Sequence, residues 1–76
     1  MVTLYTTPTC VYCKMAKDFF KANNVQYQEL DVAADNAALQ DMIKKSGQMG
    51  VPVIDINGEI LIGFNKMQVA KALGIK

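Results

Sequence analysis

The fold of this chain is decided near its start, by the stretch Val2-Thr3-Leu4-Tyr5-Thr6-Thr7-Pro8-Thr9-Cys10-Val11-Tyr12-Cys13. Its first five residues are β-branched, aromatic or aliphatic, which is typical of a strand, and the strand should stop before the proline. From position 11 to position 22, apolar residues recur at helical spacing and lysines occupy the other side, which predicts a helix. The stretch therefore places Cys10 and Cys13 where a strand is followed by a helix.

The composition limits what kind of protein this is. Seventy-six residues, of which 51% are apolar and 20% charged, fit one small soluble domain over residues 1–76. A net charge of +1 gives no electrostatic case for binding nucleic acid or an anionic membrane. No apolar run is long enough to cross a bilayer, and the first residues lack the regions of a signal peptide. We therefore expect a cytoplasmic monomer, in a compartment where structural disulfides are rare.

The rest of the chain predicts three more strands and two more helices. Asn57-Gly58 between two apolar runs is the strongest short hairpin signal, because a type I′ turn needs two positive φ angles. Asp35 and Asn65 have side chains suited to cap helix N-termini, and Gly47 and Gly74 suit helix ends. The expected strands cover residues 2–6, 25–30, 52–56 and 59–62, and the expected helices cover 11–22, 36–46 and 66–73.

The order of these elements, β-α-β-α-β-β-α, predicts an α/β fold. The first β-α-β unit should be a right-handed parallel crossover. The Asn-Gly hairpin then adds an antiparallel pair. The result is a mixed four-stranded sheet with helices on its faces.

The two cysteines are the candidate catalytic residues. Because Cys10 stands at the start of the expected helix, its sulfur should face unpaired N–H groups and the positive end of the helix dipole. A thiolate is stabilised there, so the pKa of Cys10 should fall below the value of about 8.5 of a free thiol. Cys13 lies one turn further in, on the apolar side, and should be less exposed. The pair predicts thiol–disulfide chemistry in which Cys10 attacks and Cys13 resolves the mixed disulfide.

Other uses of a cysteine pair fit the sequence less well. A structural disulfide at this spacing closes a very short loop and contributes little loop entropy. A zinc site needs four ligands, and one Cys-x-x-Cys in a chain without histidine supplies two. A dimer remains an alternative, in which Cys10 of each chain helps to hold zinc or an iron–sulfur cluster. Two buried core cysteines without chemistry are a further alternative, but the position between a strand and a helix favours a redox pair.

Three segments resemble the glutaredoxin family of the thioredoxin superfamily. Thr6–Cys13 resembles its active-site stretch, in which tyrosine commonly precedes the second cysteine. Gly47–Val53 resembles its Val-Pro segment, and Ile62–Lys66 stands where glutaredoxins carry a Gly-Gly kink and an acidic pair. The match extends over essentially the whole chain.

The resemblance implies a thioredoxin fold with strand order 2-1-3-4. It also implies that the Val51–Pro52 bond is cis, whereas only about 5–6% of X-Pro bonds are cis in general. Pro52 would lie beside Cys10, and the backbone of Val51 would pair with an extended substrate. The implied activity is that of an oxidoreductase whose Cys10–Cys13 disulfide is redox-active, with no bound cofactor or metal and with glutathione as a possible co-substrate.

Several positions depart from the family pattern. Thr7 replaces a common lysine, Ile62 replaces the first glycine, and Asn65-Lys66 replaces the acidic pair, all of which contact glutathione in glutaredoxins. Gly63-Phe64 is instead similar to the redoxins that reduce ribonucleotide reductase and take electrons from thioredoxin reductase. The electron donor therefore stays open between glutathione and thioredoxin reductase. The expected substrate is a protein disulfide, with ribonucleotide reductase among the candidates.

The remaining candidate residues surround the cysteine pair. Tyr12 is expected to be exposed and to contact the substrate, while Phe64 either packs into the core or contacts a partner. Lys14 and Lys17 fit a solvated helix face, or support a thiolate on Cys10. The expected substrate- or glutathione-binding residues are Thr7, Tyr12, Val51, Pro52, Gly63, Phe64 and Asn65.

Overall fold

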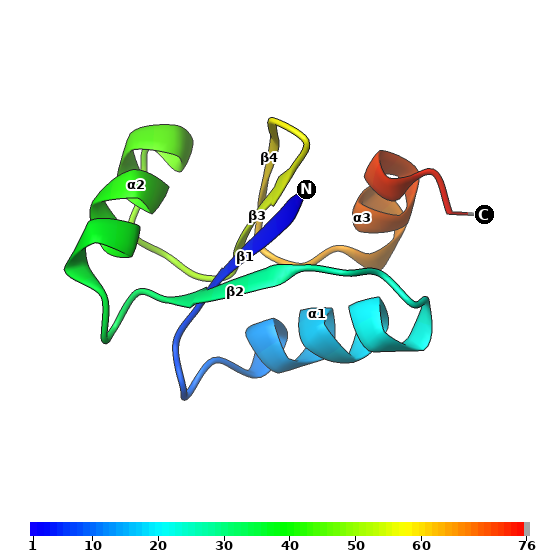
Figure 1. The fold of residues 1–76 in the computed structure, drawn as a ribbon, viewed down its shortest axis with the longest axis horizontal. Helices are drawn as coiled ribbons and strands as arrows, with labels where there is room; N and C mark the ends of the chain where they lie inside the picture. The colour runs from blue at the N-terminus through cyan, green and yellow to red at the C-terminus, as the bar shows by residue number, and fades with distance from the viewer. Residues whose placement is uncertain (76) are drawn as a thin grey trace.

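The structure is a computed structural model that describes residues 1–75 (Figure 1). Its elements in chain order are β1 (Val2–Thr6), α1 (Val11–Ala22), β2 (Gln28–Asp31), α2 (Asn36–Ser46), β3 (Val53–Ile56), β4 (Glu59–Ile62) and α3 (Lys66–Leu73). The four strands form one sheet in the order β2-β1-β3-β4. β1 and β2 are parallel, and the β1–β3 and β3–β4 pairs are antiparallel, as predicted.

The sheet carries helices on both faces, because its central strands are apolar on both sides. Leu4 and Ile54 belong to a core cluster with Phe20 of α1, and the same cluster contains a valine of α3. Tyr5 follows Leu4 in the chain and Val53 precedes Ile54, and both belong to a second core cluster, which packs under α2. Figure 1 shows α2 and α3 on either side of the β3–β4 hairpin. No helix in residues 1–75 has the length and apolar character that a membrane crossing requires.

The predicted helix and turn signals are confirmed. The side chains of Asp35 and Asn65 accept hydrogen bonds from the third residue of their helices, at 3.2 Å and 3.1 Å. Gly47 and Gly74 end α2 and α3 in the left-handed conformation. In the hairpin, Asn57 and Gly58 both have positive φ, at 53° and 97°. These signals are local, so the sequence is sufficient to predict them.

Two strand boundaries differ from the prediction. β2 begins at Gln28 and not at Val25, because the N–H of Val25 donates to the carbonyl of Phe20 at 2.8 Å and so belongs to the turn that closes α1. Val25 and Tyr27 still pack against the core from this connecting segment. β3 begins one residue after Pro52, which has no N–H to donate to the sheet.

Candidate active site

Cys10 is the N-cap residue of α1. The turn Thr7-Pro8-Thr9 leads from β1 into it, and the N–H of Cys10 donates to the carbonyl of Thr7 at 3.3 Å. Its backbone is extended (φ −87°, ψ 113°), so its sulfur takes the position that a serine or aspartate oxygen takes at other caps. The N–H of Cys13 donates to the Cys10 sulfur at 3.1 Å. A backbone donor is therefore already directed at the sulfur of Cys10.

Cys10 and Cys13 form a disulfide in the structure, with their Cα atoms 5.2 Å apart. The two sulfurs differ in accessibility: Cys10 is half-buried, whereas Cys13 is fully buried at 0% exposure. Of the two residues, Cys10 alone has surface exposed to solvent. The first-turn N–H groups and the helix dipole favour negative charge at Cys10, an effect of about 0.3–1 kcal/mol for a partly exposed group.

Three segments that are distant in sequence lie at one end of the sheet. The strand register places the last part of β1, the start of β3 and the end of β4 opposite one another. The segments that carry Cys10, Pro52 and Gly63 therefore adjoin the sheet at the same end of its strands. The N–H of Gly63 donates to the carbonyl of Pro52 at 2.8 Å, which ties two of these segments together.

The Val51–Pro52 peptide bond is cis, as the resemblance implied. Pro52 is buried and Val51 is half-buried. Within residues 1–75, no hydrogen bond engages the N–H of Val51. The N–H group that the resemblance assigns to substrate pairing therefore has no hydrogen-bond partner among the described residues.

Three apolar side chains on the segments that carry Cys10 and Val51 are exposed. Val11, Tyr12 and Met49 are 70%, 59% and 67% exposed. In a chain with a small core, exposed apolar groups are common, but these three lie on the segments that carry Cys10 and Val51. Tyr12 is therefore exposed beside the redox pair, as expected from the sequence.

The other predicted site residues have clear structural roles as well. Thr7 is half-buried and its carbonyl holds the N–H of Cys10. Phe64 packs against the ring of Phe19, with the ring centroids 5.8 Å apart. The side-chain oxygen of Asn65 caps α3 by accepting the N–H of Gln68. Phe64 and Asn65 thus stabilise α3 whether or not they also contact a substrate.

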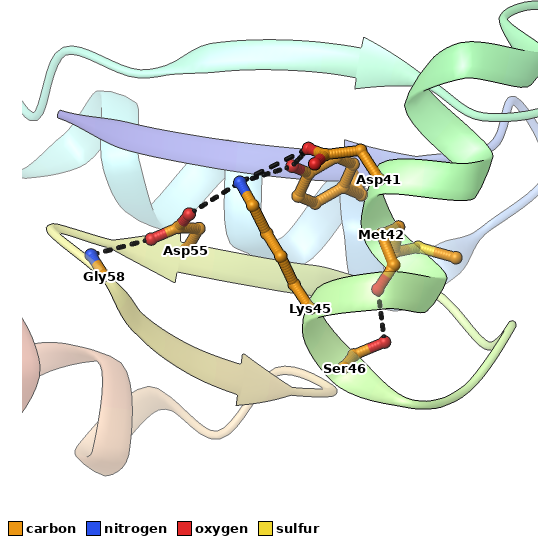
Figure 2. Close-up of polar contacts among 7 residues, drawn as sticks. Asp41, Met42, Lys45, Ser46, Asp55 and Gly58 are labelled. Carbon is orange, nitrogen blue, oxygen red and sulfur yellow. Dashed lines mark hydrogen bonds and ion pairs between the residues drawn. The ribbon is translucent and has the colours of Figure 1, made fainter.

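A second polar cluster was missed from the sequence (Figure 2). It lies between α2 and the sheet, where the hydroxyl of Tyr5 donates to Asp41 at 2.5 Å and accepts from Lys45 at 3.0 Å. Lys45 also donates to Asp55 at 3.0 Å, and the N–H of Gly58 donates to the same carboxylate at 2.8 Å. Only the Asp41–Lys45 spacing of four residues is a sequence signal for it.

The charges of this cluster stabilise one another. The hydrogen bond from Tyr5 lowers the pKa of Asp41, and the ammonium of Lys45 adds to that effect. Burial works against the ionised form of Asp55, but the bonds from Lys45 and Gly58 outweigh it and lower its pKa. Hydrogen bonds with Tyr5 and Asp55 raise the pKa of Lys45, and burial raises that of Tyr5. The cluster fixes α2 on β1 and β3, and every member already has a partner.

Within residues 1–75, no group of three histidine, cysteine, aspartate or glutamate side chains is placed to hold a metal ion. The metal- or cluster-bridged dimer requires Cys10 from two chains. A single chain does not test that alternative, which stays a prediction.

A cysteine pair at the start of the first helix, on a β2-β1-β3-β4 sheet, defines a thiol–disulfide oxidoreductase with a thioredoxin-like fold. The glutaredoxin family model matches residues 2–61. An uncharacterized glutaredoxin-like 8.6 kDa protein in the rubredoxin operon of Clostridium pasteurianum is 41% identical, over 96% of this chain and 97% of its own. Glutaredoxin 3 of Escherichia coli K12 is 36% identical, over 96% of this chain and 88% of its own.

The same relationship holds in three dimensions. A mutant of the thioredoxin-like protein BC3987 superposes with a TM-score of 0.94 at 33% identity, covering 99% of this chain and 96% of that one. The chain belongs to the glutaredoxin family. It is a dithiol oxidoreductase with the cysteine pair Cys10 and Cys13.

Proposed function

We propose that Cys10 is the attacking sulfur and Cys13 the resolving sulfur in the reduction of protein disulfides. The Cys10 thiolate attacks one sulfur of the substrate disulfide, and the other substrate sulfur leaves as a thiolate. The Cys13 thiolate then attacks the Cys10 sulfur, which releases the second substrate thiol and forms the Cys10–Cys13 disulfide. Two electrons pass to the substrate. The observation that carries this proposal is that Cys10 is accessible and Cys13 is not.

Single-cysteine variants test these roles. Cys13→Ser should accumulate a mixed disulfide with the substrate, because the resolving sulfur is gone. Cys10→Ser should have no activity and form no adduct. Intact-mass measurement after mixing with a disulfide-containing protein separates the two. A mixed disulfide through Cys13 in the Cys10→Ser variant would overturn the assignment.

The proposed substrate contacts come from the segments that adjoin one end of the sheet. The unengaged backbone of Val51 supports pairing with an extended substrate strand next to Pro52. Tyr12 supplies apolar contact, while Thr7, Gly63, Phe64 and Asn65 complete the rim on the other segments. Such a backbone-paired mode suits a protein substrate in an extended conformation, with ribonucleotide reductase among the candidates.

We propose that the electron donor is a protein dithiol enzyme of the thioredoxin reductase type. Glutaredoxins take glutathione as a co-substrate, but here the first turn of α3 has no acidic residue to hold its amine. The oxygen of Asn65 is already used in capping, and Ile62 presents an apolar side chain that is 55% exposed. A lost charged hydrogen bond weakens binding by about 1.5–3 kcal/mol.

A coupled NADPH assay with two arms tests the donor. One arm contains thioredoxin reductase, and the other contains glutathione with glutathione reductase. We expect faster turnover in the first arm. The Thr7→Lys/Lys66→Asp variant restores two charged contacts and should speed the glutathione arm by at least about tenfold, since each contact is worth about 1.5–3 kcal/mol and about 1.4 kcal/mol is a factor of ten. Wild-type turnover that is faster with glutathione would contradict the proposal.

A further inference from the structure

A hollow of about 380 Å³ opens beside Cys10, and neither Tyr12 nor Met49 lines it. Its walls hold two ammonium groups and no carboxylate: they consist of Thr7, Pro8, Thr9, Cys10, Val11, Lys14 and Lys17. The apolar residues around the disulfide do not account for this basic side of the site.

Helix geometry explains why the two lysines share a wall with the cysteine. Cys10, Lys14 and Lys17 are spaced i, i+4 and i+7, so they lie on one face of α1. Side chains of an α-helix lean toward its N-terminus, which is the end that Cys10 caps. The geometry of the helix thus accounts for both lysines lining the hollow that Cys10 also lines.

Lys17 differs from Lys14 because it is held in place. Its ammonium donates to Oε2 of Glu29 at 3.1 Å, and the hydroxyl of Thr6 donates to the same oxygen at 3.0 Å. Thr6 is buried at 2% exposure and ends β1, so this network fixes Lys17 at the strand end that leads to Cys10. Lys14 is exposed, and within residues 1–75 it makes no ion pair.

The Lys17–Glu29 ion pair contributes little to the stability of the fold. The Lys17 and Glu29 side chains are 31% and 38% exposed, and ion pairs at such positions are generally worth less than about 1 kcal/mol. An ammonium has a larger effect on the pKa of a nearby sulfur that alternates between disulfide and thiolate, because the charge of the sulfur itself changes.

We propose that Lys17 is a positioning residue that stabilises the Cys10 thiolate, and that Glu29 sets how much of the Lys17 charge acts on the sulfur. The proposal rests on the proposed function, in which Cys10 is the attacking thiolate. In the disulfide state the carboxylate holds the ammonium. When reduction creates a thiolate, the same ammonium lies between two anions and is shared between them.

The other charged groups in this part of the molecule are the same in all the variants compared below. Lys14 shares the hollow with Cys10 and Lys17. The carboxylate of Asp31, at the end of β2, accepts the N–H groups of Ala33 and Ala34. None of these is altered in the variants below, so they set a common baseline.

The test is the pH dependence of iodoacetamide alkylation of Cys10, measured in a Cys13→Ser background. Lys17→Met should raise the pKa of Cys10 by about half a unit, because an ammonium near a thiolate is lost. Glu29→Gln should lower it, because the ammonium is released toward the sulfur. Lys17→Arg should keep the wild-type value. Lys21→Met, which removes an ammonium one turn further along α1 and outside the hollow, should cause no shift.

The double variant Lys17→Met/Glu29→Gln separates coupling from a direct effect of the carboxylate. If Glu29 acts through Lys17, Glu29→Gln should shift the pKa less than half as much in the Lys17→Met background as alone. Shifts of the same sign in both single variants, or none, would overturn the proposal. If Lys17→Met does not fold, as judged by circular dichroism, Glu29→Gln and Lys17→Arg still decide it. Because alkylation needs no partner, its outcome is independent of whether Cys10 proves to be the attacking sulfur in turnover.

Discussion

At the scale of single residues, position along one helix turn separates two chemically identical cysteines. Cys10 caps α1 and is partly exposed to solvent, while Cys13 lies inside the first turn and is fully buried. The sequence is sufficient to predict this difference, because capping and helical spacing are local. The Tyr5–Lys45 contact was not predictable, because it joins residues 40 apart in sequence and depends on how α2 lies on the sheet.

The cluster around Lys45 predicts a loss of stability in acid. Asp41 and Asp55 have lowered pKa values in the folded state, so their contribution is present above the unfolded pKa of about 3.9 and is lost as the pH falls through the folded values. Asp55→Asn should cost about 1 kcal/mol at neutral pH, discounted for the partly exposed ammonium. It should also flatten the decline in stability below about pH 4.

Urea unfolding at a series of pH values measures this effect. Asp18→Asn, which removes an exposed carboxylate on α1, is the matched control and should follow the wild type. An Asp55→Asn protein whose stability declines in acid as steeply as that of the wild type would show that the cluster does not carry the pH dependence.

At the scale of elements, a capping residue precedes each of the three helices. Cys10 caps α1, Asp35 caps α2 and Asn65 caps α3. These helix boundaries were predicted from caps and glycines. The start of β2 was predicted wrongly, because the alternation from Val25 to Tyr27 reflects packing of a connecting segment against the core and not a paired strand.

Loss of the α3 cap predicts a measurable cost in stability. Asn65→Ala removes the oxygen that accepts the N–H of Gln68 and should lower the free energy of unfolding by about 0.5–2 kcal/mol. Asn65→Ser keeps a capping oxygen and should recover most of it. Urea midpoints of the three proteins provide the measurement. Equal midpoints for the alanine and serine variants would show that the cap contributes nothing.

At the scale of the whole molecule, the sheet order creates the site. The segments around positions 10, 51 and 63 lie at one end of the sheet because β1 and β4 both pair with β3 in this register. The element order and a known family pattern predicted this arrangement. The cis Val51–Pro52 bond came only from the family resemblance, since most X-Pro bonds are trans and the residues themselves give no sign of the exception.

The central claim is that Cys10 attacks the substrate and Cys13 resolves the mixed disulfide, because only Cys10 is accessible to solvent. The most direct measurement is competitive alkylation of the fully reduced wild-type protein with substoichiometric iodoacetamide at neutral pH, followed by peptide mass mapping. We predict that Cys10 is alkylated first and that Cys13 stays unmodified until Cys10 is consumed. Equal labelling of the two sulfurs, or labelling of Cys13 first, would contradict the account.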